Sequence, residues 1–225
     1  MEKFFPSRSA LITLIACCLV VIIALGIRQT FGLFYFDFST DLDITISQFG
    51  FAMGLQLFLW GAFSPLFGII TDKYGGNIAI FLGFLFFLLG VLLFYSGFNT
   101  GVYFIYTIGV LIGVGLGSTA IGIPVSVVAK HFPASKRTIA TGIVTCAGSF
   151  GYFVSPVLVK YSLNVSGWEN TIFYFCLLLG LGLLIALFVT TPKIPVGENQ
   201  NNNQTATEAL KEAFSNKSFI YLTLG

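Results

Sequence analysis

The stretch Gly68-Ile69-Ile70-Thr71-Asp72-Lys73-Tyr74-Gly75-Gly76 separates two long apolar runs, residues 49–70 and 78–98. A helix needs ~20 apolar residues to cross the hydrocarbon core of a bilayer, and each run is long enough. Only a few residues remain between the runs for the chain to reverse. The stretch therefore predicts a tight membrane hairpin of two helices.

Glycines provide the conformational freedom that such a reversal needs. Gly68, Gly75 and Gly76 permit positive φ angles and close backbone contacts. Asp72 and Lys73 fall in the same stretch and are predicted to mark where the hairpin meets water. The sequence allows two interpretations of Asp72: a solvated turn residue, or a carboxylate that interacts with the N-terminus of another helix.

The composition excludes a soluble domain. Hydrophobic residues make up 56% of the 225 residues and charged residues 9%, whereas soluble domains carry about a quarter charged residues. The mean hydropathy of +0.92 indicates a polytopic membrane protein. The net charge of +2 is too small to indicate nucleic-acid binding.

Six apolar spans are predicted, all α-helical. They cover residues 10–35, 49–70, 78–98, 102–128, 139–161 and 172–189. The first span is too long for the apolar core of a signal peptide, which is ~7–15 residues, and is interpreted as an uncleaved helix. We expect a six-helix bundle over 1–190, a polar cytoplasmic linker over 191–217 and the truncated start of a seventh helix over 218–225.

Basic residues predict the orientation, because Lys and Arg gather on the cytoplasmic side of membrane proteins. If the spans alternate, one side receives nearly all of them and the other receives Lys160. We therefore expect a cytoplasmic N-terminus. The residues on the predicted cytoplasmic side are Lys3, Arg8, Lys73, Lys130, Lys136, Arg137, Lys193, Lys211 and Lys217.

Arg28 lies inside the first span, in the predicted outer half of the bilayer. A charged residue at membrane depth costs ~2.5 kcal/mol or more on insertion scales, so it normally faces a protein interior or a wet cavity. One interpretation is a cation that binds an anionic substrate, with Gln29 and Thr30 as neighbouring polar groups. The other is an arginine that reaches the outer interface or pairs structurally with a carboxylate.

The fourth and fifth spans are rich in small residues, which let helix backbones approach closely in lipid. Pro124 is expected to bend the fourth span near its cytoplasmic end. The predicted helix-packing residues are Gly109, Gly113, Gly115, Gly117, Gly148, Gly151 and Pro156.

The pattern Gly68-x-x-x-Asp72-Lys73-x-Gly75 resembles the loop signature of the major facilitator superfamily, between its second and third helices. That signature usually continues with two basic residues, where this chain has Gly76 and Asn77. The resemblance implies two six-helix halves with the substrate bound between them, and alternating access by rocking. It also implies a cytoplasmic gating loop formed by Gly68, Asp72, Lys73 and Gly75.

Within that superfamily the chain is more similar to monocarboxylate transporters and oxalate/formate antiporters. The resemblance includes a basic residue in the first helix, near Arg28, and implies a small, anionic substrate. It departs from many other facilitators at Gly109, where they have an arginine. The motifs are Gly113-x-Gly115-x-Gly117, Pro124, His131-Phe132-Pro133-x-x-Lys136-Arg137-x-x-Ala140-x-Gly142 and Ala147-Gly148-Ser149-x-Gly151.

The leading hypothesis is a secondary transporter of a small organic anion in a bacterial inner membrane, with the rest of the cavity in a missing second half. An intramembrane enzyme would need a nucleophile and a base at membrane depth, and His131 falls in a predicted loop. A non-transporting six-helix protein and a half-transporter acting as a dimer are the alternatives. No cofactor, metal or nucleic acid is expected, since the cysteines show no CxxC spacing.

Overall fold

The computed structural model describes residues 5–98, 100–192 and Ser215. The chain divides into two units, Met1–Pro192 and Lys193–Gly225. The fold below is that of the first unit. The predicted linker and the predicted start of a seventh helix fall almost entirely outside the described residues, so both stay predictions.

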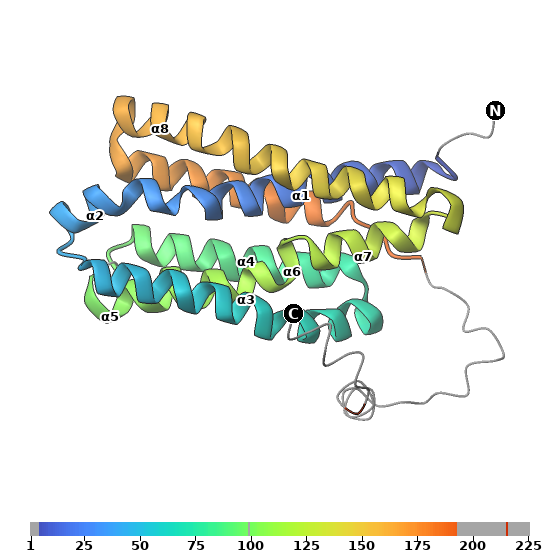
Figure 1. The fold of residues 1–225 in the computed structure, drawn as a ribbon, viewed down its shortest axis with the longest axis horizontal. Helices are drawn as coiled ribbons and strands as arrows, with labels where there is room; N and C mark the ends of the chain where they lie inside the picture. The colour runs from blue at the N-terminus through green and yellow to red at the C-terminus, as the bar shows by residue number, and fades with distance from the viewer. Residues whose placement is uncertain (1–4, 99, 193–214, 216–225) are drawn as a thin grey trace. The chain divides into compact units, whose positions relative to one another are not determined.

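The regular structure in the described part of the chain is helical throughout (Figure 1). Long helices run along a bundle, and shorter 3-10 and π-helical segments continue two of them. The elements are α1 (Arg8–Thr30), the 3-10 helix η1 (Phe31–Phe34), α2 (Tyr35–Asp41), α3 (Ile46–Tyr74), α4 (Gly76–Tyr95), α5 (Gly101–Phe104), the π-helix η2 (Ile105–Leu111), α6 (Ile112–Thr119), α7 (Gly122–His131) and α8 (Ala134–Ala186).

Within residues 5–98 and 100–192, five helical stretches are long and apolar enough to cross a membrane, and the last one holds two of the predicted spans. Within α8, Gly167 has φ 77° and ψ 174°, outside the helical region, so the chain reverses there. Figure 1 shows α8 running along the bundle and returning beside itself. The predicted all-α membrane fold is confirmed, and each of the six predicted spans corresponds to a helical segment.

The first span is longer than predicted. The sequence places its end at residue 35, but helical structure continues through η1 and α2 to Asp41. Phe34 and Phe38 are fully buried in this extension, so apolar packing keeps the polar end of the stretch helical. Ser7 caps the start of α1 by accepting a hydrogen bond from the Ala10 N–H at 3.0 Å.

The fourth span, in which a bend at Pro124 is predicted, is interrupted a few residues before that proline. The helix stops at Thr119 and resumes at Gly122, with Ala120 in an extended conformation (ψ −158°). Proline has no N–H to donate to the carbonyl four residues earlier, which is that of Ala120. The break therefore lies where an unbroken helix would have lost a hydrogen bond.

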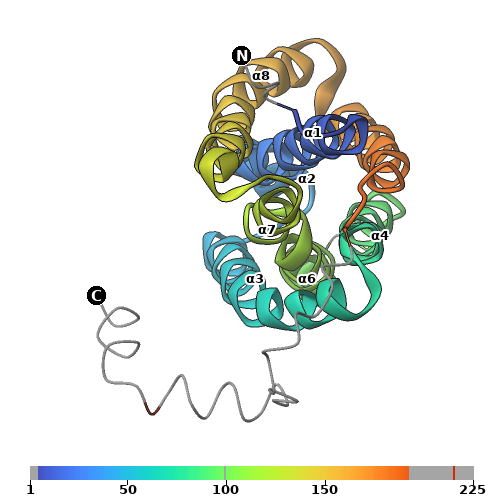
Figure 2. The ribbon, with the colours of Figure 1, turned by 90° about the vertical axis from the view of Figure 1, so that its right-hand side faces the viewer.

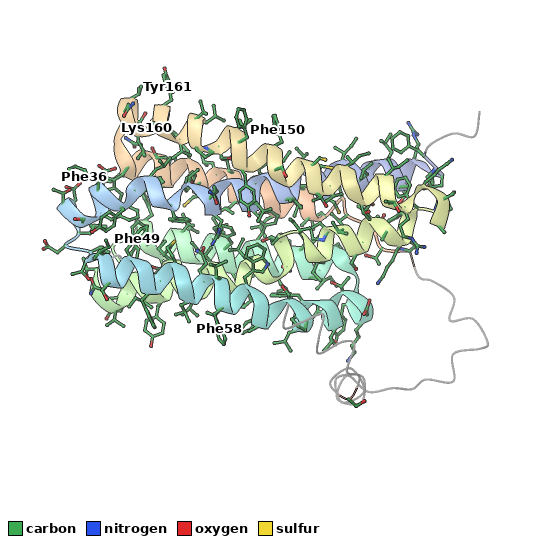
Figure 3. All side chains as sticks on the ribbon, in the orientation of Figure 1. Phe36, Phe49, Phe58, Phe150, Lys160 and Tyr161 are labelled. Atoms are coloured by element: carbon green, nitrogen blue, oxygen red, sulfur yellow. The ribbon has the colours of Figure 1, made fainter. Side chains whose placement is uncertain are left out.

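Viewed end-on, the helices form a bundle in which α6 lies between α3 and α4, and α1 lies against α8 (Figure 2). Large apolar side chains remain on the outside of this bundle. Phe58 on α3 is 70% exposed and Phe150 on α8 is 57% exposed, and both project outward in Figure 3. Such apolar exposure suits a surface covered by lipid or by other transmembrane helices.

Candidate functional site

Arg28 lies near the end of α1, about 20 residues or ~30 Å along the helix from its start. Its side chain is half-buried. Its Nε donates a hydrogen bond to Oε1 of Gln56 on α3 at 3.3 Å. The guanidinium carbon lies 5.9 Å from the ring centroid of Trp60, one helical turn further along α3. The arginine is therefore held by one face of a neighbouring helix.

Gln56 is fully buried, and both ends of its amide are satisfied. Its Nε2 donates to the carbonyl of Ile108 at 3.0 Å, in the π-helical segment η2. In an α-helix that carbonyl would accept from Ile112, whose N–H instead bonds to Gly109. The Ile108 carbonyl of this π-helical segment thus accepts a hydrogen bond from a side chain of another helix.

The positive charge of Arg28 has no carboxylate beside it in the described part of the chain. The bond to Gln56 uses Nε, and no described residue accepts a hydrogen bond from the two terminal nitrogens, Nη1 and Nη2. Two parallel N–H groups on a planar guanidinium match the two oxygens of a carboxylate. Chemically, this arrangement can bind a small oxyanion.

The structure does not bring Gln29 and Thr30 to the same contacts as Arg28. Gln29 is exposed. Thr30 is fully buried, and its hydroxyl donates to the Ile27 carbonyl of its own helix at 2.7 Å. A role for either side chain in binding stays a prediction.

Sequence reasoning missed Gln56 and Trp60. The sequence does contain a signal for Gln56, which is a polar amide inside the apolar run 49–70. Polar side chains in such runs commonly bond to a neighbouring helix.

The predicted gating loop has one glycine at the turn and one outside it. Gly75 has φ 102° and ψ 156° and separates α3 from α4. Gly68 was predicted to help the chain reverse, and this is wrong: it lies inside α3, and a Cβ there would meet no atom within 4 Å. At Gly76 a Cβ would collide with the side chain of Val127, so the close approach expected there is present.

Asp72 forms an ion pair with Lys130, with Nζ and Oδ1 2.7 Å apart. Both residues lie in the last turn of their helices, α3 and α7. A cation is favourable at a helix C-terminus, so Lys130 suits its own position and also compensates the carboxylate of Asp72. Lys73 lies over the ring of Tyr74, with Nζ 5.1 Å from the centroid. The basic partner of Asp72 thus comes from a distant part of the sequence.

The glycines of the fourth span pack against α3 along one face. Added Cβ atoms would lie 3.3 Å from the Ala52 Cα at Gly109, 2.9 Å from the Gln56 carbonyl oxygen at Gly113 and 3.0 Å from the Phe63 Cβ at Gly117. At Gly115 the neighbour is α4, with the Gly83 carbonyl oxygen 2.5 Å away.

The fifth span packs in the same way against α1. A Cβ at Gly148 would lie 2.9 Å from Val21, and one at Gly151 would lie 2.8 Å from the carbonyl oxygen of Ile22. Pro156 lies inside α8 and is half-buried. Both small-residue helices therefore make backbone-close contacts.

Thr190 and Thr191, at the end of the sixth span, form hydrogen bonds with three other elements. The Thr190 hydroxyl lies 2.9 Å from that of Thr13 on α1, and the Thr190 carbonyl lies 2.7 Å from Nε2 of His131 on α7. Thr191 accepts a hydrogen bond from the N–H of Gly76 at 2.7 Å. The first N–H groups of a helix have no partner within that helix, and Gly75 has no side chain to cap α4. Thr191 therefore supplies an acceptor for the first of these N–H groups.

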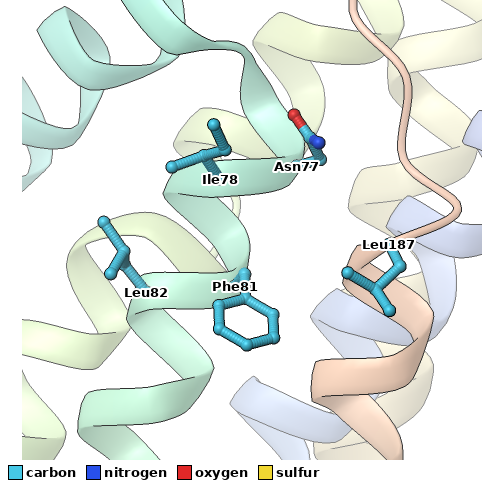
Figure 4. A pocket seen from close by; sticks show the side chains of 5 residues that line it. All are labelled: Asn77, Ile78, Phe81, Leu82 and Leu187. Carbon is cyan, nitrogen blue, oxygen red and sulfur yellow. The ribbon is translucent and has the colours of Figure 1, made fainter.

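A small pocket of roughly 220 Å³ lies between the start of α4 and the end of α8 (Figure 4). Its lining is apolar apart from one amide, so it lacks the converging polar groups of a binding site for an anion. Residues 5–98 and 100–192 hold no group of three His, Cys, Asp or Glu side chains that could bind a metal. The pocket is lined by Asn77, Ile78, Phe81, Leu82 and Leu187.

Known proteins that resemble the chain include transporters named for nitrate and for monocarboxylates. The chain is similar to the Probable nitrate transporter NarT of Staphylococcus epidermidis, with 24% identity over 73% of this chain and 42% of that protein. It is also similar to Monocarboxylate transporter 7 of Homo sapiens, with 24% identity over 84% of this chain and 37% of that protein. The chain therefore spans about two fifths of the length of these relatives.

A crystal structure of the POT family transporter PepTSo shares the fold, with a TM-score of 0.65 and 16% identity over 92% of this chain and 45% of that one. The model of the Major Facilitator Superfamily matches residues 17–225. That match covers nearly all of the sequence and confirms both the predicted superfamily and the expectation that the chain is not an enzyme. The chain belongs to the Major Facilitator Superfamily, a family of multi-pass membrane transporters.

Proposed function

We propose that the chain forms the first half of a secondary transporter of a small organic anion, with monocarboxylates as the substrate class. The observation that carries the proposal is the guanidinium of Arg28, which faces no carboxylate among the described residues. An uncompensated cation at membrane depth is costly, and an anionic solute would compensate it. The relatives named for monocarboxylates and for nitrate support a small oxyanion.

Alternating access would follow from rocking of two halves around the bound solute. The close glycine contacts of α6 and α8 support compact, stiff helix pairs that move as units. In this proposal the end of the bundle that holds Lys73, Lys130 and Arg137 faces the cytoplasm of a bacterium, because basic residues favour that side. Gly68, Asp72, Lys73 and Gly75 would act in the gate at this end.

The test is uptake of radiolabelled formate, acetate, lactate, pyruvate and nitrate by the full-length protein in proteoliposomes. Arg28→Ala should raise KM about 10- to 100-fold, since charged hydrogen bonds contribute about 1.5–3 kcal/mol. Transport of an anion at unchanged KM in Arg28→Ala would remove Arg28 from the site. Uptake of a neutral solute alone would overturn the substrate class.

A non-transporting six-helix protein and a half-transporter that works as a dimer are the competing functions. Both predict that a second six-helix half is not needed in the same chain. Uptake by the full-length protein would contradict the non-transporting function. The mass of the active particle distinguishes a dimer of half-transporters from one chain with two halves.

A further inference from the structure

Arg28 has two edges that can each hold two oxygens of a carboxylate. One edge consists of Nε and one terminal nitrogen, and the other consists of the two terminal nitrogens, Nη1 and Nη2. Gln56 accepts the hydrogen bond from Nε at 3.3 Å, so the first edge is already used. Only the Nη1–Nη2 edge then remains for a bidentate partner.

Trp60 restricts the same group in a second direction. Its ring centroid lies 5.9 Å from the guanidinium carbon of Arg28, so the guanidinium lies over the face of the indole. Gln56 and Trp60 are four residues apart, and both reach Arg28 from one side of α3. Gln56 occupies one edge of the guanidinium, and Trp60 adds a ring contact from the same helix.

The amide of Gln56 cannot easily turn to present its NH₂ group to the arginine. Its Nε2 donates to the Ile108 carbonyl at 3.0 Å, and the residue is fully buried. Reversing the amide would place an N–H group against the guanidinium and an oxygen against a carbonyl, losing both hydrogen bonds. The π-helical segment therefore determines which end of Gln56 faces Arg28.

We propose that Gln56 is a positioning residue that orients the guanidinium of Arg28, so that its Nη1–Nη2 edge takes the carboxylate of the solute. This inference rests on the proposed function and adds the residue that sets the geometry of recognition. Gln56 does not touch the solute and acts through Arg28.

A double-mutant cycle on the full-length protein tests this, with KM and the maximal rate of acetate uptake as readouts. Arg28→Lys keeps the charge but replaces the planar fork by a point charge, which has no edge to orient. Gln56→Leu removes both hydrogen bonds with a side chain of similar size. Each single change should raise KM about tenfold, and the double variant should match Arg28→Lys within about twofold.

Asn170→Leu is the control, because it also replaces a side-chain amide by leucine. Unlike the buried Gln56, Asn170 is exposed, and among the described residues it bonds to its own helix, at the Ser166 carbonyl. It should leave KM unchanged. Effects that multiply to about 100-fold in the double variant would overturn the positioning role, since Gln56 would then act independently of Arg28. So would an unchanged KM in Gln56→Leu.

The two proposals fail in different ways. No acetate uptake by the unmodified protein would overturn the proposed function for monocarboxylates. Acetate uptake with an unchanged KM in both Arg28→Lys and Arg28→Ala would remove Arg28 from the site, and the positioning role of Gln56 with it. A raised KM in both Arg28 variants with no effect of Gln56→Leu would leave that function intact and remove only the positioning role. A fall in the maximal rate and in the unfolding temperature of Gln56→Leu, without a change in KM, would assign Gln56 to packing alone.

Discussion

Asp72 and Lys130 join the ends of α3 and α7 through an ion pair of 2.7 Å. The Asp72 side chain is 73% exposed, whereas that of Lys130 is 23% exposed. Exposed pairs contribute about 0.2–1 kcal/mol because water and salt screen them. The pair is therefore suited to breaking and re-forming during a conformational cycle, and contributes little to the free energy of unfolding.

The prediction for Asp72→Asn is a small loss of stability and a larger loss of transport. We expect the free energy of unfolding to fall by less than about 1 kcal/mol, and the difference to shrink in high salt. Thermal unfolding in detergent at two salt concentrations measures the first effect, and initial uptake rates measure the second. Lys73→Gln is the control for stability, since Lys73 forms no ion pair with a described residue. Full transport by Asp72→Asn would argue against a role in the gate.

A second prediction concerns the contact of Gly113 with α3. An alanine there would place Cβ 2.9 Å from the Gln56 carbonyl oxygen and 3.0 Å from the Gln56 Cα, so the backbones would have to separate. Overpacking of this kind costs about 1–3 kcal/mol. Gly113→Ala should lower the unfolding temperature, measured by the fraction that stays monodisperse after heating.

Gly142→Ala is the matched control for that change, because a Cβ at Gly142 meets no atom within 4 Å. It should be neutral or stabilising by up to about 1 kcal/mol, since alanine is the better helix former. Equal effects of the two alanines would contradict the packing of α6 on α3. A shift of Arg28 would also be expected in Gly113→Ala, because Gln56 moves with its backbone.

The helices could be predicted from the sequence because each apolar run is long enough to span a bilayer. The contacts between these helices could not be predicted. Nothing in one sequence says that the spacing of Gly109, Gly113 and Gly117 faces α3, whereas Gly115 faces α4. The glycine periodicity predicts close packing, and the partner depends on how the helices assemble.

The candidate site shows the same limit. Arg28 could be identified because a charge at membrane depth is rare. Gln56 is 28 residues away, and its contact with Arg28 depends on the placement of α1 against α3. The sequence also predicts too early an end for the first span. Polar residues follow it and favour a loop, but the buried Phe38 keeps this part of the chain helical.

A third prediction tests the cap that Thr191 gives to α4. Thr191→Val keeps the shape of the side chain and removes the acceptor of the Gly76 N–H. Loss of a capping group costs about 0.5–2 kcal/mol, so the unfolding temperature should fall. The same substitution at Thr141 should have little effect, because that exposed hydroxyl bonds only to carbonyls of its own helix. No difference between the two variants would show that Thr191 does not cap α4.

The last prediction separates the two glycines of the gating stretch. Gly75 has φ 102° and ψ 156°, a conformation that side chains other than glycine adopt at a cost of about 1–3 kcal/mol. Gly68 is helical, with open space where its Cβ would be. Gly75→Ala should therefore lower the unfolding temperature, whereas Gly68→Ala should not. If Gly68→Ala nevertheless lowers the uptake rate, the residue acts where another part of the transporter approaches α3 during the cycle. If both rate and stability are unchanged, Gly68 is not part of the gate, and the turn at Gly75 and the Asp72–Lys130 pair would be the parts of the stretch left to operate it.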